Sequence, residues 1–160
     1  MKNLILTILL ALLFLPAFSQ SKGVEALYQK HKSSQDFFHM DLGGNFLNFA
    51  EGFNVKMDKS QTESLVKTLD RVKLFKVPQK LNAGNADYKS LTKSLERENY
   101  DLLIETSDKS NNILVYTKGN KSISDVVVLL NDKSGDLMVV ELLGKFDAKT
   151  LADAGKSIGK

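Results

Sequence analysis

The pattern of hydrophobic and polar positions starts with an unbroken apolar run over residues 4–15. It follows the basic Lys2 and ends in a Pro-Ala-Phe-Ser stretch at 16–19, with small residues where a signal peptidase recognises its substrate. These are the three parts of a secretory signal peptide. The run is well short of the roughly 20 residues that span a bilayer. We therefore predict that residues 1–19 are a cleaved leader and that Gln20 begins the mature chain.

Helical periodicity, with apolar residues three or four positions apart, follows in five segments. In residues 23–32 it places Val24, Leu27, Tyr28 and His31 on one face. A second helix is predicted after the N-cap residue Asn45, with Phe46, Phe49, Ala50 and Phe53 on one stripe. The remaining predicted helices are one that begins at Ser60, one over residues 85–97, and a terminal one capped by Asp147.

Strand periodicity, with alternate residues on opposite sides, occurs first at residues 37–42. Phe38, Met40 and Leu42 lie on one side there, and His39 and Asp41 on the other. A second strand is predicted over 71–77, where Pro78 ends it. Four further extended segments cover 100–106, 113–117, 123–130 and 137–143, and short polar connections join them. Such short connections join antiparallel neighbours, because a parallel crossover needs a dozen or more residues.

The predicted fold is therefore one α+β domain over residues 20–160. We expect an antiparallel sheet of about five or six strands, with a C-terminal four-strand meander and with helices mainly on one face. Residues 126–130 and 137–140 are continuously apolar, which indicates burial on both faces of the sheet. The shield on the second face could be the Phe-rich segment 46–53, a second copy of the protein, or a bound apolar ligand. We favour an intramolecular core.

The amino-acid composition indicates in which compartment the protein works and which classes of partner it does not bind. The chain has no Cys, which excludes disulfides, a thiolate nucleophile, a Cys-ligated zinc and an acylated N-terminal Cys. A cysteine-free exported domain of this size is typical of a bacterial periplasmic or secreted protein. The formal net charge is +3, or +2 without Lys2, and Arg occurs only at Arg71 and Arg97. The near absence of the bidentate guanidinium argues against nucleic-acid binding.

Few residues are candidates for catalysis or metal binding. His39 and Asp41 point the same way on the predicted strand and could chelate a cation or form a base with its orienting carboxylate, although a solvent-exposed polar face would give the same pattern. His31, on an apolar helical stripe, is expected to pack at a helix end. The segment 131–136 reads as a hairpin loop, because it lacks the ligand pattern of a calcium loop and the context of a nucleophile elbow. We predict no catalytic residue, metal or cofactor.

The order of these elements resembles the domain-of-unknown-function 4252 family of Bacteroidetes. The resemblance rests on the leader, the early helix and strand before Gly43, and the closing hairpin in which residues 136–144 (DLMVVELLG) precede a short helix. It implies an exported envelope protein without an assigned activity, and it carries no functional residue over.

Together these features predict a periplasmic or secreted, non-enzymatic binding or interaction module without a transmembrane segment in its mature chain. Its expected partner is an envelope protein or a second copy of itself. One alternative is a carrier of a small apolar ligand such as a lipid, bound near Phe46, Phe49 and Phe53. The other is a hydrolase that uses His39 and Asp41.

Overall fold

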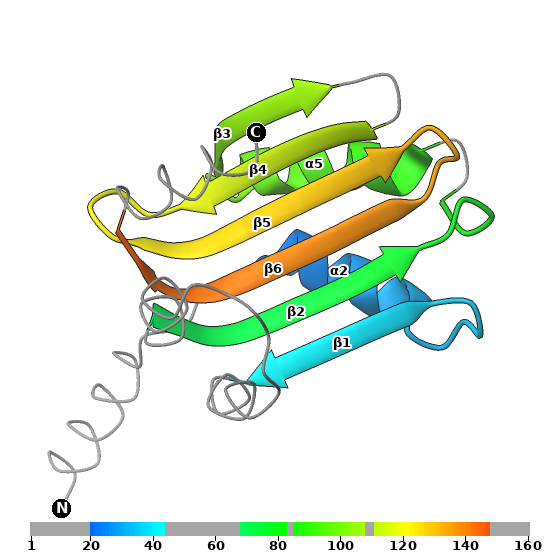
Figure 1. Cartoon of the computed structure of the whole chain (residues 1–160), viewed down its shortest axis with the longest axis horizontal. Helices are drawn as coiled ribbons and strands as arrows, with labels where there is room; N and C mark the ends of the chain where they lie inside the picture. Colours follow the sequence, from blue (N-terminus) through cyan, green and yellow to red (C-terminus); the bar gives the residue numbers. More distant parts are fainter. Residues whose placement is uncertain (1–19, 44–67, 83–84, 108–110, 148–160) are drawn as a thin grey trace, which may run out of the picture.

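The computed structural model describes residues 20–43, 68–82, 85–107 and 111–147. These residues form two helices and six strands (Figure 1). In chain order the elements are α2 (Lys22–His31), β1 (Phe38–Gly43), β2 (Leu69–Val77), α5 (Ala86–Arg97), β3 (Asp101–Ser107), β4 (Asn111–Lys118), β5 (Ile123–Asp132) and β6 (Leu137–Phe146). Each predicted element that falls on described residues is present, within a few residues of its expected ends. The predicted helices at 45–53, after Ser60 and after Asp147 lie outside the described residues.

The strands form one antiparallel sheet in the order β1-β2-β6-β5-β4-β3. The four C-terminal strands are consecutive neighbours, so the predicted meander is confirmed. The sheet grows beyond the meander because β6 also pairs with β2, with Val77 opposite Leu137. This pairing makes β5 and β6 the two central strands, which agrees with their apolar sequences.

Both helices cover the same face of the sheet, which we call the inner face (Figure 1). The main core lies between the two layers. Val24 and Leu27 of α2, and Leu91 and Leu95 of α5, are buried there. From the sheet, the core contains the buried residues Phe75, Val77, Leu114, Tyr116, Val127, Leu129, Leu137 and Val139. The expected two-layer α+β architecture is confirmed, and neither described helix is long and apolar enough to cross a membrane.

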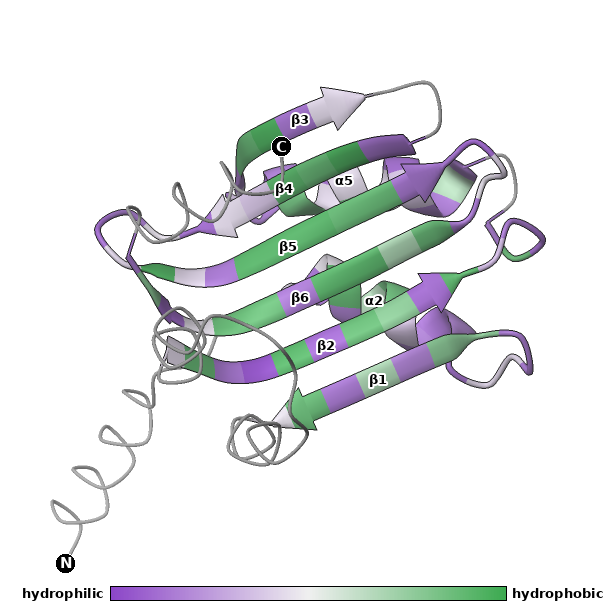
Figure 2. Cartoon of the chain, viewed as in Figure 1, coloured by the Kyte–Doolittle hydropathy of each residue, from purple (hydrophilic) through white to green (hydrophobic). Residues whose placement is uncertain are grey.

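The opposite face, which we call the outer face, is also apolar. Figure 2 shows hydrophobic residues running along the central strands. The pairing registers place these alternate residues on it: Phe38, Met40 and Leu42 on β1, Val72 and Leu74 on β2, Met138, Val140 and Leu142 on β6, Val126, Val128 and Leu130 on β5, and Ile113 and Val115 on β4. Ile123, Val126 and Phe146 are buried there as a small second cluster. Most of the others are only half-buried, and Phe38 is 59% exposed.

Candidate functional site

The pair that the sequence singled out, His39 and Asp41, lies on the inner face of β1, because His39 is opposite Phe75 of the core. The two side chains have different partners. Arg71 holds Asp41 with two hydrogen bonds, Nε to Oδ1 at 2.7 Å and Nη2 to Oδ2 at 2.5 Å. This guanidinium lowers the pKa of Asp41 below its ordinary value. The His39 ring instead stacks on Phe37, with 5.7 Å between ring centroids.

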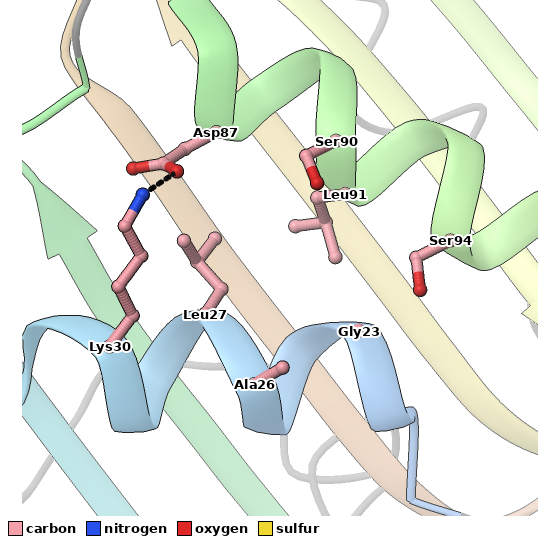
Figure 3. A pocket seen from close by; sticks show the side chains of 8 residues that line it. All are labelled: Gly23, Ala26, Leu27, Lys30, Asp87, Ser90, Leu91 and Ser94. Atoms are coloured by element: carbon pink, nitrogen blue, oxygen red, sulfur yellow. Dashed lines mark hydrogen bonds and ion pairs between the residues drawn. The ribbon is translucent and has the colours of Figure 1, made fainter.

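The second histidine, His31, is the last residue of α2 and is buried, as expected of a ring that packs at a helix end. Its Nε2 lies 2.7 Å from Oδ2 of Asp87 on α5. Lys30 Nζ lies 2.6 Å from Oδ1 of the same carboxylate (Figure 3). Asp87 therefore links the end of α2 to the start of α5. In the part of the chain that the structure describes, no three His, Asp or Glu side chains are grouped to hold a metal ion.

A hollow of about 190 Å³ lies between α2 and α5 (Figure 3). Its walls are mainly small residues, among them Gly23, Ala26, Ser90 and Ser94. The two helices approach closely at Gly23, where an added Cβ would lie 2.7 Å from Cβ of Ser94. The hollow is smaller than the 300–1,000 Å³ of typical ligand pockets. We assign it to helix packing.

Among the described carboxyl groups, the two with the largest pKa shifts are acids that sequence reasoning did not select, Asp125 of β5 and Glu141 of β6. Both are 0% exposed and both lie on the inner face, since Glu141 is opposite Val127 and Asp125 opposite Leu143. They are therefore diagonal neighbours on adjacent strands. We call them the buried acidic pair. Burial of an ionised carboxylate without full pairing is costly, so such groups are candidates for a functional role.

The partners of the buried acidic pair come from the helix layer and the loop after it. The Tyr100 hydroxyl donates to Asp125 Oδ2, and the backbone N–H of Ser21 donates to Glu141 Oε1 at 3.0 Å. The other oxygens, Asp125 Oδ1 and Glu141 Oε2, are buried without a hydrogen-bond partner among the described residues. A buried acceptor left unpaired costs free energy, and an ionised one costs more.

Burial raises the pKa of Asp125 to about 6, although the hydrogen bond from Tyr100 opposes the rise. Burial also raises the pKa of Glu141 to about 7, and the charge of Asp125 adds to that rise. Lys73 and the N–H of Ser21 act in the opposite direction on Glu141. The buried acidic pair therefore takes up or releases protons in the range in which most carboxyls stay ionised.

A third acid, Glu98, lies where α2 begins. It is the C-cap residue of α5, and its carboxylate accepts the backbone N–H groups of Lys22 at 2.7 Å and Gly23 at 2.8 Å. The Ser21 hydroxyl accepts the next one, from Val24, at 3.1 Å. The first N–H groups of a helix have no partner within it. Here Glu98 satisfies two of them from a distant part of the chain, and Glu141 binds the N–H of the N-cap residue Ser21, so the start of α2 is fixed to both α5 and β6.

One sequence signal could have found the buried acidic pair. Glu141 interrupts the apolar run of β6, and Asp125 directly precedes the apolar run of β5. An acid within a strand predicted to be buried on both faces has to find a partner in the interior. The partners of the two acids could not be found in this way, because they are distant along the chain. Tyr100 is 25 residues from Asp125, and Ser21 is 120 residues from Glu141.

The predicted ligand residues Phe46, Phe49 and Phe53 lie outside the described residues, so that prediction stays a prediction. The hairpin loop predicted at residues 131–136 is confirmed as the turn between β5 and β6. The Asp132 N–H closes it by donating to the Asp136 carbonyl at 3.1 Å. Gly135 adopts a φ of 89° in it, a value that favours glycine.

These features define a two-layer α+β domain whose helical layer is tied to a buried acidic pair in the sheet. A family model, described as a domain of unknown function (DUF4252), matches residues 28–154. The chain belongs to this family, as the resemblance suggested. Searches of curated proteins and of solved structures gave no match.

Proposed function

We propose that this chain is an exported, non-enzymatic binding module that takes up an apolar protein surface on the outer face of its sheet. The observation that carries the proposal is the composition of that face, which is apolar on five neighbouring strands. Soluble monomers rarely expose contiguous apolar patches larger than a few hundred Å² unless the patch is an interaction site. Neither described helix lies on this face.

The shape of the described surface favours a protein as the occupant. The hollow of about 190 Å³ and a more open one of about 390 Å³ both lie beside α2, away from the outer face. A small apolar ligand needs a concave site that surrounds it, whereas a sheet face suits another extended surface. The edge strand β1, which carries Phe38 and Met40, could extend such an interface by strand addition.

A matched pair of variants tests the binding surface. Phe38→Ser with Met40→Ser changes two exposed residues of the outer face, whereas Leu102→Ser with Leu103→Ser changes two exposed leucines on the other edge strand. We expect the first variant alone to lose concentration-dependent association in light scattering, or to lose an envelope partner captured by crosslinking. Equal behaviour of both variants and the natural chain contradicts the proposal. A lipid retained in native mass spectrometry would instead favour the carrier alternative.

The export part of the proposal rests on the leader pattern of residues 1–19. It is supported by the position of Ser21, which caps α2 directly after the proposed cleavage site. The N-terminal sequence of protein taken from the envelope fraction tests it. We expect Gln20 as the first residue, and cytosolic protein that keeps Met1 would contradict export.

The hydrolase alternative has its own test on the two residues that the sequence suggested. His39→Ala is compared with the natural chain on a panel of esterase and phosphatase substrates. An activity that survives His39→Ala unchanged, or no activity at all, removes the alternative.

A further inference from the structure

Acidic groups from three elements converge where α2 begins. Glu98 of α5 accepts the N–H groups of Lys22 and Gly23, and Glu141 of β6 accepts that of Ser21. Glu25, on the first turn of α2, accepts the Gln20 side-chain amide at 3.0 Å. Asp125 lies behind them as the diagonal neighbour of Glu141.

Of the cations near these acids, Lys73 lies opposite Glu141 in the sheet but pairs with Glu25. Lys73 Nζ lies 2.5 Å from Glu25 Oε2 and 4.8 Å from the centroid of the Tyr28 ring. The Arg71 guanidinium is held by Asp41, and Lys118 Nζ lies over the Tyr100 ring. Glu141 Oε2 and Asp125 Oδ1 remain without a hydrogen-bond partner among the described residues, although both side chains are fully buried. The acids near the start of α2 therefore outnumber the cations that pair with them, so one more positive charge there would be attracted.

The residue-20 nitrogen is the group best placed to supply that charge. Covalent geometry holds it about 3–4 Å from the Ser21 nitrogen. The Ser21 nitrogen itself lies 3.0 Å from Glu141 Oε1. A positive charge on residue 20 would therefore lie at most about 6–7 Å from Glu141 Oε1, close to the range over which opposite charges shift each other's pKa. In the uncleaved chain this nitrogen is part of a neutral peptide bond.

We propose that these acids form the binding site for the chain's own α-ammonium group, which is created at Gln20 when the leader is removed. The inference rests on the proposed processing after Ser19. In that step water adds to the Ser19 carbonyl carbon and the bond from that carbon to the Gln20 nitrogen breaks. Ser19 leaves as a carboxylate, and the nitrogen takes up protons and becomes an ammonium group. Removal of the leader thereby supplies the missing cation at the place where the folded domain begins.

The test compares two forms of the chain 20–160, released with Gln20 first from a cleavable fusion. One form keeps its free amine. In the other, Gln20 is cyclised: its α-nitrogen attacks its own side-chain carbonyl carbon and ammonia leaves, so the terminal charge disappears. We expect cyclisation to lower the Tm at pH 7 by about 2–4 °C in a domain of this size, because the attraction of the acids outweighs the positive end of the α2 dipole.

Two variants separate the effect of the α-ammonium charge from that of the hydrogen bond made by the Gln20 side chain. Gln20→Ala keeps a free amine but lacks the side-chain amide that binds Glu25. We therefore expect its Tm to be closer to that of the free-amine form than to that of the cyclised form. Glu141→Gln removes one carboxylate charge with little change in shape. We expect the Tm difference between free-amine and cyclised forms to shrink by at least half in Glu141→Gln.

A direct titration decides the question independently of stability. We expect NMR of chain labelled at Gln20 to give an α-amino pKa above the ordinary value of about 8. The stabilisation is then lost as pH rises through the raised pKa of the amine, and it also weakens at acidic pH, where Glu141 and Asp125 are protonated. An α-amino pKa at or below 8, or equal Tm values for the two forms, overturns the inference. A different N-terminus on exported protein would instead overturn the proposed processing.

Discussion

Single residues couple the two layers of this domain. Glu141 is held by the N–H of Ser21 at the start of α2, and Asp125 by Tyr100. Each contact joins an inner-face acid on a central strand to a group on the helical side of the core. Hydrogen bonds to charged groups contribute about 1.5–3 kcal/mol, more than neutral ones. These contacts therefore position the helices as well as satisfy the acids.

Tyr100→Phe tests this coupling. It leaves Asp125 Oδ2 without its hydroxyl donor in a buried site. We expect a loss of about 2 kcal/mol in the free energy of unfolding at pH 8, where Asp125 is ionised. At pH 5 the carboxyl is protonated and the loss should be about half as large. Urea unfolding at both pH values measures this, and Tyr116→Phe serves as the control for a buried phenol on β4. An equal loss at the two pH values would contradict the assignment.

A second prediction concerns the pH dependence of stability. Burial raises the pKa of Asp125 to about 6 and that of Glu141 to about 7, from ordinary values of 3.8 and 4.5. The native state therefore binds more protons than the unfolded state between about pH 4 and pH 8, and stability falls as pH rises through this range. We expect a decrease on the order of 5 kcal/mol for chain without a charge on residue 20, since a pKa difference of one corresponds to about 1.4 kcal/mol.

The measurement is a series of urea unfolding curves from pH 4 to pH 8, with Asp125→Asn and Glu141→Gln as comparisons. Each substitution should flatten the curve, because it removes one titrating group. These curves are recorded on the cyclised form, which has no charge on residue 20, and a curve that is flat or rises over this range would show that the two acids titrate normally.

At the level of elements, local periodicity was sufficient to place the described helices and strands and to predict the meander. It could not predict that β6 also pairs with β2, because that choice depends on contacts between residues 60 or more positions apart. It also gave no preference for which side of β1 faces the core. The aromatic side, with Phe37 and His39, packs under α2, whereas Phe38 and Met40 face outward.

Two strand glycines give a test of sheet packing. A Cβ on Gly144 of β6 would lie 2.0 Å from the backbone oxygen of Thr68, whereas a Cβ on Gly43 of β1 meets nothing within 4 Å. We expect Gly144→Ala to lower the free energy of unfolding by about 1–3 kcal/mol, since backbone cannot easily move away. Gly43→Ala should be neutral or slightly stabilising. Denaturant midpoints compare the two, and equal midpoints would contradict the close approach at Gly144.

At the level of the whole molecule, stability should fall from the centre of the sheet to its edges. Most of the sheet's buried residues are on the central strands β5 and β6, whereas the side chains of β3 are exposed or half-buried. Regions with few buried apolar contacts open most easily. We expect hydrogen exchange by mass spectrometry to show the slowest exchange in β5 and β6 and the fastest in β1 and β3. Uniform protection across the sheet would contradict this gradient.

The strand order also determines when the domain can exist during biosynthesis. β2 and β5 are both neighbours of β6 and not of each other, so the two halves of the sheet are joined only through residues 137–146. A nascent chain that has not yet released this strand from the ribosome has two separate pieces of sheet and an incomplete core. Such a chain lacks the strand that joins the two pieces, so we expect a truncation that ends before Leu137 to show no cooperative unfolding transition.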